Sequence, residues 1–521
     1  MGYEGRETLG RTGPFFEGAM DRMVAPGRTG RHSVRIMARS PHPGMHRVRI
    51  VALDRDDEVH DAIVRAPNPG VTDGTFSLTY PEEEPGARAL RAGTPYAFRL
   101  WHEASDELVG EGRFETAHEP GTEGARRCTF GILSCHNPFA DDGTLQPEAL
   151  RCLEIAPRVF DQVGASRLLM MGDQVYGDLP EAQSLFEPAH FRRVAPPGRS
   201  SIFDCTRREA RHLYQERHRI FWKTERFREL QARWATHPIL DDHEVVDNFG
   251  SLPEHAGPRW RNVRDGALDA FHDYQARRVF GERRPPSFQH GFSVGDVAVY
   301  VMDLRSQRSA QGERIELYAR SQLGQLRHFL TQHRERRAIV LVLSVPILHV
   351  PDWIATVGGK ITGEGSDVAD RWSYDRCQLS RDALLDVLET HRRAAPHQQL
   401  VVAGGDVHVG AAMRLNWRHD SLRTHQLVSS AISNHQGALH ERIAEAVPKT
   451  SSVMGRARSI YAEAELLKGA DGANRNPFGG LNVGVIDFEG RGAETGVRMR
   501  LFSHDDAPVP APVPVFDSGW L

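Results

Sequence analysis

Five short and almost uninterrupted apolar segments constrain the fold of this chain more than any other feature of its sequence. Because they do not alternate between polar and apolar residues, each predicts a strand that is buried on both faces. Stretches with helical periodicity separate them, which is typical of a layered α/β domain. The predicted strands are CTFGILSC (128–135), RLLMMGD (167–173), VAVYVMDL (297–304), AIVLVLSV (338–345) and QLVVAGGD (399–406). The predicted helices are 147–163, 207–222, 320–333 and 380–393.

The residues before this domain have a different pattern. From about residue 31 to 117, short alternating segments are separated by Pro, Gly and Asp turns, which predicts a small sandwich of about seven strands. The predicted domains are a β-sandwich at 1–120, an α/β domain at 128–503 and a Pro-rich tail at 504–521 that lies extended against the surface. The charged, Pro-interrupted segment 180–290 is expected to be an insertion over the site and not part of the core.

The bulk composition excludes several classes of protein. A formal net charge of -4 offers no basic field for nucleic acid, and no apolar run is long enough to span a membrane. The five cysteines form no CxxC pair, which favours a reducing compartment. The N-terminus has neither an apolar signal segment nor a twin arginine, so we expect a cytoplasmic protein, or an exported one whose signal has been removed. Nothing in the sequence predicts its oligomeric state.

Four apolar runs end in side chains that can bind metal ions. These side chains stand in the segments SCHN (134–137), GDQVYGD (172–178), DDHE (241–244, after HPIL) and GGDVH (404–408). In open α/β sheets, ligands gather where the carboxyl ends of the strands meet the following loops. One Asp or His at a strand end is more commonly a turn or a helix cap. Four together favour a site.

The residue types indicate the chemistry of that site. Hydrolysis of a phosphoester needs a hydroxide nucleophile at neutral pH and positive charge against the phosphoryl oxygens, and two metal ions about 4 Å apart supply both. A shared carboxylate can hold the two ions at that spacing, while thiolate, phenolate, imidazole and carboxylate ligands distinguish soft from hard metals. Tyr176 follows Asp173 by three residues, so a tight loop would direct both at one ion.

At these residues the sequence resembles the alkaline phosphatase D (PhoD-like) family of metallophosphatases. The resemblance covers nearly the whole chain and rests on motifs in a matching order: SC (134–135), MGDQVYGD (171–178), DDHE (241–244), MDLRSQR (302–308), DRWSY (370–374) and GGDVH (404–408). The family belongs to the calcineurin-like phosphoesterase superfamily. The implied fold is therefore an immunoglobulin- or fibronectin-like β-sandwich followed by a double-sheet α/β sandwich flanked by helices.

The resemblance also implies a ligand set. Four side chains would surround one ion, which is ferric iron in the family: Cys135, Asp173, Tyr176 and His408. Asp173 would bridge to a second ion, calcium or another divalent metal, completed by Asp242 and Asp406. A metal-activated hydroxide would then attack phosphorus in a small phosphoester, as in an alkaline phosphatase or phosphodiesterase.

The implied catalytic residues are His243, Asp173 and Arg305. His243 and Arg305 would contact the phosphate, with His243 as proton donor to the leaving group. His136 would be either a further phosphate contact or a residue that only orients a ligand. Glu244 is expected to support His243 or Arg305, and Arg308 to form a solvated salt bridge.

Some features stay open at this level. His349 is either another metal ligand or a core histidine, and Asp178 either binds calcium through water or caps a turn. Ser373 stands where the family's motif more often carries Asp and Gly, which would alter the substrate pocket. Two alternatives to the phosphatase remain: a phospholipase-type phosphodiesterase of the same family, and a catalytically silent binding module.

Overall fold

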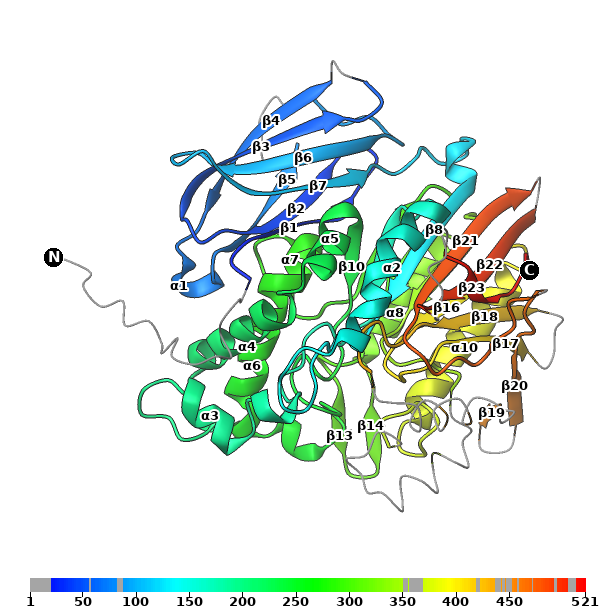
Figure 1. Ribbon diagram of the computed structural model, residues 1–521. Coiled ribbons are helices and arrows are strands. Elements are labelled where there is room, and N and C mark those ends of the chain that lie inside the picture. The colour runs from blue at the N-terminus through cyan, green and yellow to red at the C-terminus, as the bar shows by residue number, and fades with distance from the viewer. Residues whose placement is uncertain are drawn as a thin grey trace.

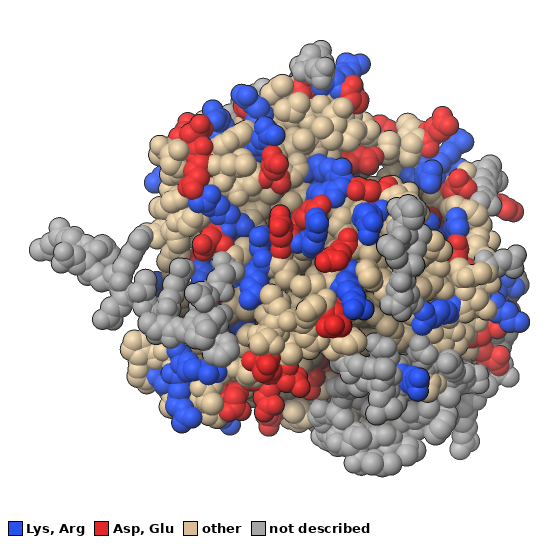
Figure 2. Space-filling model, viewed as in Figure 1, with Lys and Arg blue, Asp and Glu red and all other residues tan. Residues whose placement is uncertain are grey.

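The computed structural model comprises a β-sandwich and, below it in Figure 1, a larger α/β unit with two sheets and covering helices. It describes residues 20–55, 58–81, 88–349, 355, 369–417, 422–435, 442, 446, 452–456, 459–470, 472–491, 494–504 and 512–521. Among the described helices, none combines the length and the apolar character needed to cross a membrane. Figure 2 shows positive and negative side chains intermixed over the visible face.

The N-terminal unit is the predicted sandwich of antiparallel strands. One sheet has the order β1-β2-β5 and the other β4-β3-β6-β7. Along β4, exposed and buried residues alternate strictly, so one face of the strand is exposed to solvent and the other packs on the core. Ile36, Ile50, Leu78 and Phe98 form part of that core. The strands are β1 Met23–Thr29, β2 Val34–Arg39, β3 Gly44–Ala52, β4 Val59–Ala66, β5 Thr75–Tyr80, β6 Pro95–His102 and β7 Glu107–Glu115.

The α/β unit is built on two larger sheets. The six-stranded sheet has the order β10-β9-β8-β21-β22-β23, with β8 Arg127–Leu133, β9 Arg167–Met170, β10 Ala235–Pro238, β21 Val483–Arg491, β22 Glu494–Phe502 and β23 Pro514–Asp517. The eight-stranded sheet has the order β11-β12-β15-β16-β18-β17-β20-β19, with β11 His290–Val294, β12 Val297–Val301, β15 Ala338–Val342, β16 Gln399–Gly404, β17 Ala411–Trp417, β18 Arg423–Val428, β19 Ser452–Arg456 and β20 Ser459–Leu466. A small hairpin pairs β13 Ser309–Gln311 with β14 Arg314–Glu316.

All five predicted buried strands are confirmed as β8, β9, β12, β15 and β16. Their side chains are buried on both faces because the two sheets pack against each other and helices cover the outside. Phe130 and Leu169 of one sheet share a core with Val299, Val340 and Val401 of the other. β8, β9 and β10 run parallel, as do β12, β15, β16 and β18.

Helices cover the outer faces of both sheets. Phe160 of α2 packs with Leu168 of β9, while Leu326 of α8 and Leu388 of α10 pack with Leu341 of β15. The helices are α1 Pro69–Thr72, α2 Pro147–Val163, α3 Pro188–Val194, α4 Arg207–Phe221, α5 Glu225–Arg233, α6 Arg261–Phe271, α7 Arg277–Phe280, α8 Arg320–Gln332 and α10 Gln378–Ala394. A π-helical turn spans His272–Ala276, and the 3₁₀ turns are Gly124–Arg126, Glu181–Gln183, Ile202–Asp204, Pro253–Ala256 and Pro258–Trp260.

Two expectations about the arrangement of the chain need correction. The segment 180–290 is more than a cover over the site, because it adds β10 to the six-stranded sheet and has a core of its own that includes Leu213 and Phe271. The Pro-rich tail does not simply lie on the surface: β23 pairs with β22, and Phe516 is fully buried. Short strands such as these carry too few residues to show a periodicity.

A buried polar cluster joins the sandwich to the α/β unit. Arg39 of β2 contacts Asp73 at 3.1 Å and donates to the Tyr274 hydroxyl at 3.0 Å. Nearby, Gly27 of β1 lies so close to Arg278 of α7 that an added Cβ would be 2.2 Å from the Arg278 carbonyl oxygen. The two units therefore meet through close backbone packing as well as through charge.

A second buried network lies within the sandwich, around Glu58. The Tyr96 hydroxyl donates to its carboxylate at 2.6 Å, His60 Nε2 contacts it at 3.1 Å, and Arg91 forms an ion pair with it. Burial alone would raise the pKa of Glu58, but the hydrogen bonds from these partners outweigh it and hold the pKa at about 2.

We expect Glu58 to contribute to the acid sensitivity of the sandwich. Because its pKa falls from 4.5 to about 2 on folding, its stabilisation is present above pH 4.5 and is lost as the pH falls towards 2. Glu58→Gln should therefore lower stability at pH 7 and flatten the loss between pH 4.5 and pH 2, measured by urea denaturation. Glu111→Gln, which removes an exposed partner of Arg99, is the control. An unchanged pH dependence in Glu58→Gln would contradict the assignment.

Candidate metal centre

The predicted metal-binding segments meet where strands of both sheets end. Cys135 follows β8, Asp173 follows β9 and Asp406 follows β16. The Cys135 and His136 amides donate to the carbonyl oxygens of Gly172 and Asp173 at 3.2 and 2.7 Å, so the first two loops are joined directly.

The third loop approaches the other two through a glycine. A Cβ on Gly405 would lie 2.8 Å from the Ser134 side chain and 2.9 Å from that of Met171. Only glycine lets the loop after β16 come this close without displacing the loops of the other sheet. The GGD sequence therefore lets the loops of the two sheets come close together and also positions Asp406, a predicted ligand.

The predicted ligands share an uncommon backbone conformation. Of the seven non-glycine residues with positive φ in the described chain, four are predicted metal ligands: Cys135, Asp173, Asp406 and His408, with φ of 55°, 55°, 64° and 51°. Side chains in this left-handed region are sterically disfavoured and collect at functional sites, where the surrounding structure imposes the conformation. Each strand end thus turns sharply enough to direct its side chain into the centre.

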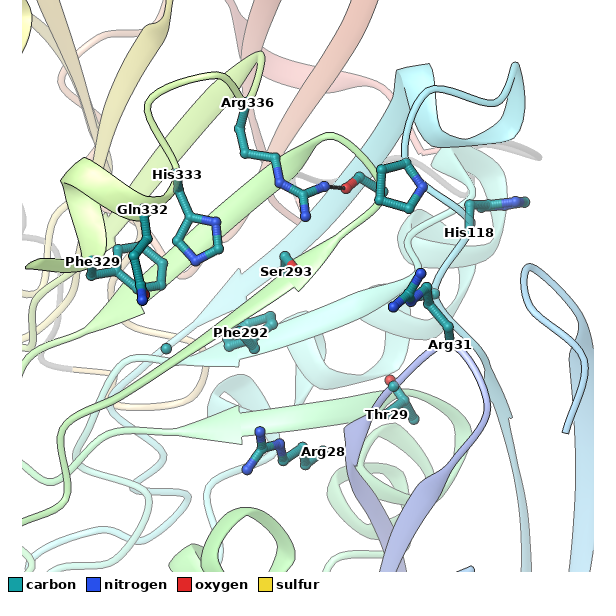
Figure 3. Close-up of a pocket in the computed structure, with 15 residues that line it drawn as sticks. Arg28, Thr29, Arg31, His118, Phe292, Ser293, Phe329, Gln332, His333 and Arg336 are labelled. Carbon is teal, nitrogen blue, oxygen red and sulfur yellow. Dashed lines mark hydrogen bonds between the residues drawn. The ribbon is translucent and has the colours of Figure 1, made fainter. Parts of the chain in front are cut away.

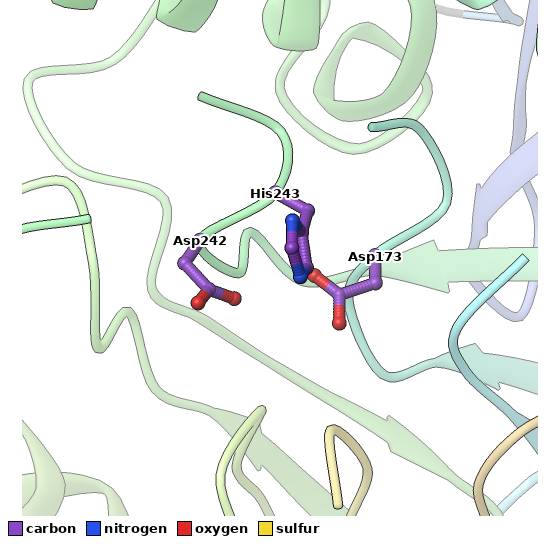
Figure 4. Close-up of side chains that lie close together, drawn as sticks. All are labelled: Asp173, Asp242 and His243. Atoms are coloured by element: carbon purple, nitrogen blue, oxygen red, sulfur yellow. The ribbon is translucent and has the colours of Figure 1, made fainter. Parts of the chain in front are cut away.

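Carboxylates are concentrated where these loops meet. Two overlapping groups have potential ligand atoms within 4.8 Å of one another: Asp173, Asp242 and His243, drawn in Figure 4, and Asp173, Asp241, Asp242 and Asp406. The Cys135 thiol lies beside them, 3.4 Å from Asp173 Oδ2, and accepts a hydrogen bond from the Ser430 hydroxyl at 3.1 Å.

Tyr176 and His408, which are far apart in the sequence, are linked by Asn434. The Asn434 amide nitrogen lies 3.2 Å from the Tyr176 hydroxyl oxygen and 3.2 Å from His408 Nε2. The Tyr176 ring also packs against His243, with centroids 4.3 Å apart. Asn434 was not predicted, because it stands in SNH (433–435) with no preceding apolar strand of the kind that marked the other segments.

The electrostatics of the cluster suit a bound cation. Asp173 Oδ1, Asp241 Oδ2 and Asp242 Oδ1 are buried, and none accepts a hydrogen bond within the described part of the chain. Burial, together with neighbouring acidic groups, raises the pKa values of Asp173 and Tyr176, and burial raises the pKa of Cys135 to about 11. Positive charge from metal ions would reverse these shifts and stabilise the anionic ligands.

Arg305 lies at the centre but has a different environment from the one expected. Its side chain is fully buried, donates to Asp241 at 2.5 Å and forms a two-pronged contact with Asp370 at 3.0 and 2.7 Å. The Arg305 guanidinium also donates to the Phe249 carbonyl oxygen and lies 3.5 Å from the Asp242 carboxylate. The guanidinium therefore positions carboxylates and has no free edge for a phosphate in this arrangement.

Other expectations around Arg305 also change. Arg308 forms the expected salt bridge, with Asp370 at 2.8 Å, but the pair is buried and not solvated. Arg371, which was not singled out, forms an ion pair with Asp406. The sequence signal for Arg371 is its place inside DRWSY (370–374), one of the motifs that carry the family resemblance.

His243 is held by a carboxylate outside the metal-binding groups. His243 Nδ1 donates to Asp178 at 2.9 Å, and Asp178 also accepts the Asp247 amide at 2.9 Å. Burial alone would lower the pKa of His243, but Asp178 and Asp242 outweigh it and raise the pKa to about 10. Asp178 thus orients His243, a role that neither of its predicted alternatives included.

His136 and His349 are both buried histidines with lowered pKa values. Both ring nitrogens of His136 have partners, the Ser433 hydroxyl at 2.8 Å and the Phe221 carbonyl at 3.0 Å, and the ring stacks on Phe227. This favours the orienting role of His136 over the predicted phosphate contact. Burial lowers the pKa of His136 and of His349 to about 3, which keeps both rings neutral.

Glu244 supports the backbone of the centre, and not His243 or Arg305 as expected. Its carboxylate accepts the amides of Asp173, Gln174 and Asp241 at 3.2, 2.8 and 2.9 Å. These amides belong to the loops after the neighbouring parallel strands β9 and β10. One side chain therefore fixes two ligand-bearing loops relative to each other.

The sequence and the fold were compared with those of known proteins. A sequence model of the PhoD-like phosphatase family matches residues 158–473. A solved structure of PhoD is 15% identical with a TM-score of 0.63, over 95% of this chain and 88% of that one. A purple acid phosphatase from yellow lupin (Lupinus luteus) seeds is 10% identical with a TM-score of 0.51, over 95% of this chain and 74% of that one. A search of curated proteins gives no match.

The double-sheet α/β fold is shared with these two solved structures. The match to the phosphatase family model, together with the acidic side chains gathered at the strand ends, makes this chain a phosphoester hydrolase of the metallophosphatase type. The family match, which covers more than half of the chain, makes the assignment specific: the chain belongs to the PhoD-like phosphatase family. The predicted family, fold class and enzyme class are confirmed. The individual site residues and the metals remain predictions.

The role of Glu244 can be tested without touching a predicted ligand. Glu244→Ala should leave three buried amides without an acceptor, at about 1–3 kcal/mol for each unsatisfied group. We expect a lower free energy of unfolding, measured in urea, and a lower metal content, measured by elemental analysis. Glu254→Gln, at an exposed position nearby, is the control. Wild-type stability and metal content in Glu244→Ala would rule out the bridging role.

Proposed function

We propose that the protein hydrolyses small phosphoesters at this centre with the help of two metal ions. The observation that carries the proposal is the convergence of Asp173, Asp242 and Asp406 from three separate strand ends, where the buried Oδ1 of Asp173 accepts no hydrogen bond from the described residues. A cluster of acids this deeply buried is unfavourable unless cations compensate it. When bound, the two ions would lower the pKa of a water molecule and neutralise charge on the phosphoryl oxygens.

The side chains divide into two ligand sets. Four would hold the first ion, for which iron(III) is proposed because thiolate and phenolate favour it: Cys135, Asp173, Tyr176 and His408. Asp173, Asp242 and Asp406 would hold the second ion, for which calcium or another divalent ion that prefers oxygen ligands is proposed. Asp241 belongs to the same cluster, but its contact with Arg305 favours a supporting role.

His243 is proposed as the proton donor to the leaving-group oxygen. The hydrogen bond from Nδ1 to Asp178 orients the ring, and Nε2, which lies 3.8 Å from the exposed Asp247 carboxylate, would donate the proton. The neighbouring carboxylates favour the protonated imidazole that a general acid requires. Asp178 is then a positioning residue for His243.

Arg371 is proposed in place of Arg305 as the arginine that contacts the phosphoryl group. Arg305 is enclosed by Asp241 and Asp370, whereas Arg371 extends to Asp406, a carboxylate whose charge a metal ion would share. A guanidinium beside the centre offers planar paired donors that match phosphoryl oxygens. Arg305 is then the buried counter-charge that holds Asp241 and Asp370 in place.

Removal of the shared ligand tests the proposed centre. Asp173→Asn should lower hydrolysis of an aryl phosphate and of a bis-aryl phosphate by about 100-fold or more, together with metal content. The two substrates also separate monoesterase from diesterase activity. Cys135→Ala and Tyr176→Phe should each alter the charge-transfer absorbance of an iron(III) centre. Asp142→Asn, in an exposed turn, is the control. Full activity and metal content in Asp173→Asn would exclude the assignment.

Substitution of Arg371 tests the phosphate contact. Loss of a hydrogen-bonded ion pair with phosphate should raise the KM for an aryl phosphate and the inhibition constant of inorganic phosphate by about 10–100-fold. Arg371→Lys should recover part of the affinity but not the paired geometry. Arg320→Ala, which removes an exposed arginine of α8, is the control. If Arg371→Ala bound phosphate as the wild type does, the assignment would fail.

A further inference from the structure

A cavity of about 670 Å³ lies between the sandwich and the α/β unit, at a distance in the fold from the metal ligands. Its walls come from the end of β1, the connection after β7, strand β11 and the end of α8, as Figure 3 shows. Cavities of about 300–1,000 Å³ are typical of binding sites for small molecules.

The charged side chains that line this interdomain cavity are all arginines, and burial lowers the pKa of His333, which favours its neutral form. Three arginines and two histidines line it, with no carboxylate among the lining residues: Arg28, Arg31, Arg336, His118 and His333. Such an excess is unusual in a chain with a formal net charge of -4. A recess lined by one sign of charge concentrates small ions of the opposite sign.

Part of this positive charge is compensated from outside the cavity. Arg31 pairs with Glu119 at 2.6 Å and His118 with Glu115 at 3.2 Å. Arg336 donates to the Gly295 carbonyl oxygen at 2.5 Å, a neutral acceptor that leaves its charge in place. Arg28 is exposed and forms no ion pair within the described residues. Arg28 and Arg336 therefore supply positive charge that no carboxylate among the described residues pairs with.

The cavity also has aromatic surface. Phe292 lies in its wall and is stacked from behind by His237, with ring centroids 3.6 Å apart and planes 8° apart. Phe329 of α8 lies beside Gln332 and His333 in Figure 3, and its ring packs against that of His333 with centroids 4.3 Å apart. A ligand with a carbon skeleton could bury that skeleton on these rings while its anionic groups face Arg28 and Arg336.

The topology separates this cavity from the metal centre. Gly295 stands in the turn that precedes β12, and Arg336 stands two residues before β15. Both therefore lie at the amino edge of the parallel strands, whereas Arg305 and Asp406 follow the carboxyl ends. A small molecule in the cavity would not be the substrate in the centre. It would bind to both units at once.

We propose that the interdomain cavity is a second binding site, for a small organic anion with at least two negative charges, such as a phosphonate, a phosphate ester or a polycarboxylate. The anionic groups contact the guanidinium groups of Arg28 and Arg336, and the ligand stabilises the contact between the sandwich and the α/β unit. The site is independent of the proposed chemistry at the metal centre.

Calorimetric titration of the metal-loaded protein tests this site. The probes are methylenediphosphonate, whose P–C–P linkage is not an ester, and tricarballylate, which carries carboxylates instead. We expect at least one probe to bind the wild type, and Arg28→Glu to weaken that binding about tenfold or more, since a charge-assisted hydrogen bond is lost and a repulsion added. The probe that responds identifies the class of anion.

A matched variant controls for the change in charge. Arg334→Glu alters an exposed arginine in the connection between α8 and β15 that is paired with Glu335 and does not line the cavity. It should bind the probe as the wild type does. Hydrolysis of an aryl phosphate by Arg28→Glu should stay at the wild-type rate. The proposal is overturned if neither probe binds the wild type, or if Arg28→Glu binds the responding probe as tightly as the wild type does.

Discussion

Glu244 accepts hydrogen bonds from the backbone of two loops, one after β9 and one after β10, and the positions of Asp173 and the 241–242 pair follow from it. Asp173 has a left-handed backbone that the loop would not adopt without such external support. The geometry of the proposed ligands therefore depends on a residue that is not itself proposed to bind metal or substrate. Arg305 and Asp178 are supporting residues of the same kind: Arg305 holds acidic side chains in place, and Asp178 orients His243.

The centre also has to tolerate several buried acids in one small volume. Two features reduce the electrostatic cost of burying these acids together. Arg305 supplies one permanent positive charge to Asp241 and Asp370, because a guanidinium stays protonated even when buried. Buried oxygens of Asp173 and Asp241 accept no hydrogen bond within the described residues, and metal ions there would complete the balance of charge. Folding and metal binding are thus coupled, since each ion bound by the folded state stabilises it.

The sequence predicted long elements well because burial leaves a strong pattern there. The helix predicted at 147–163 has those bounds in the structure, and all five apolar runs became strands. The short strand β23 was missed, because four residues reveal no period, and β10 was indicated only by the short apolar run HPIL (237–240). The motifs located the residues of the centre but did not predict their partners. Arg305 is an example, because Asp241 and Asp370, which enclose it, lie more than 60 positions away in the sequence. Arg371 and Asn434 lie in segments whose role only the folded chain reveals.

The pairing of β8 with β21 has a consequence for how the protein is made. Thr129 and Asp487 are hydrogen-bonded neighbours in this sheet although 358 positions separate them in the chain. On the ribosome, β8 and the loop that carries Cys135 emerge long before the strand that covers their edge. The unpaired edge of β8 is then open to other chains until β21 and β22 have been translated. We therefore expect β8 to be the strand that most needs chaperones and that aggregates most readily when translation is slow. The N-terminal sandwich, whose strands all pair locally, should fold early.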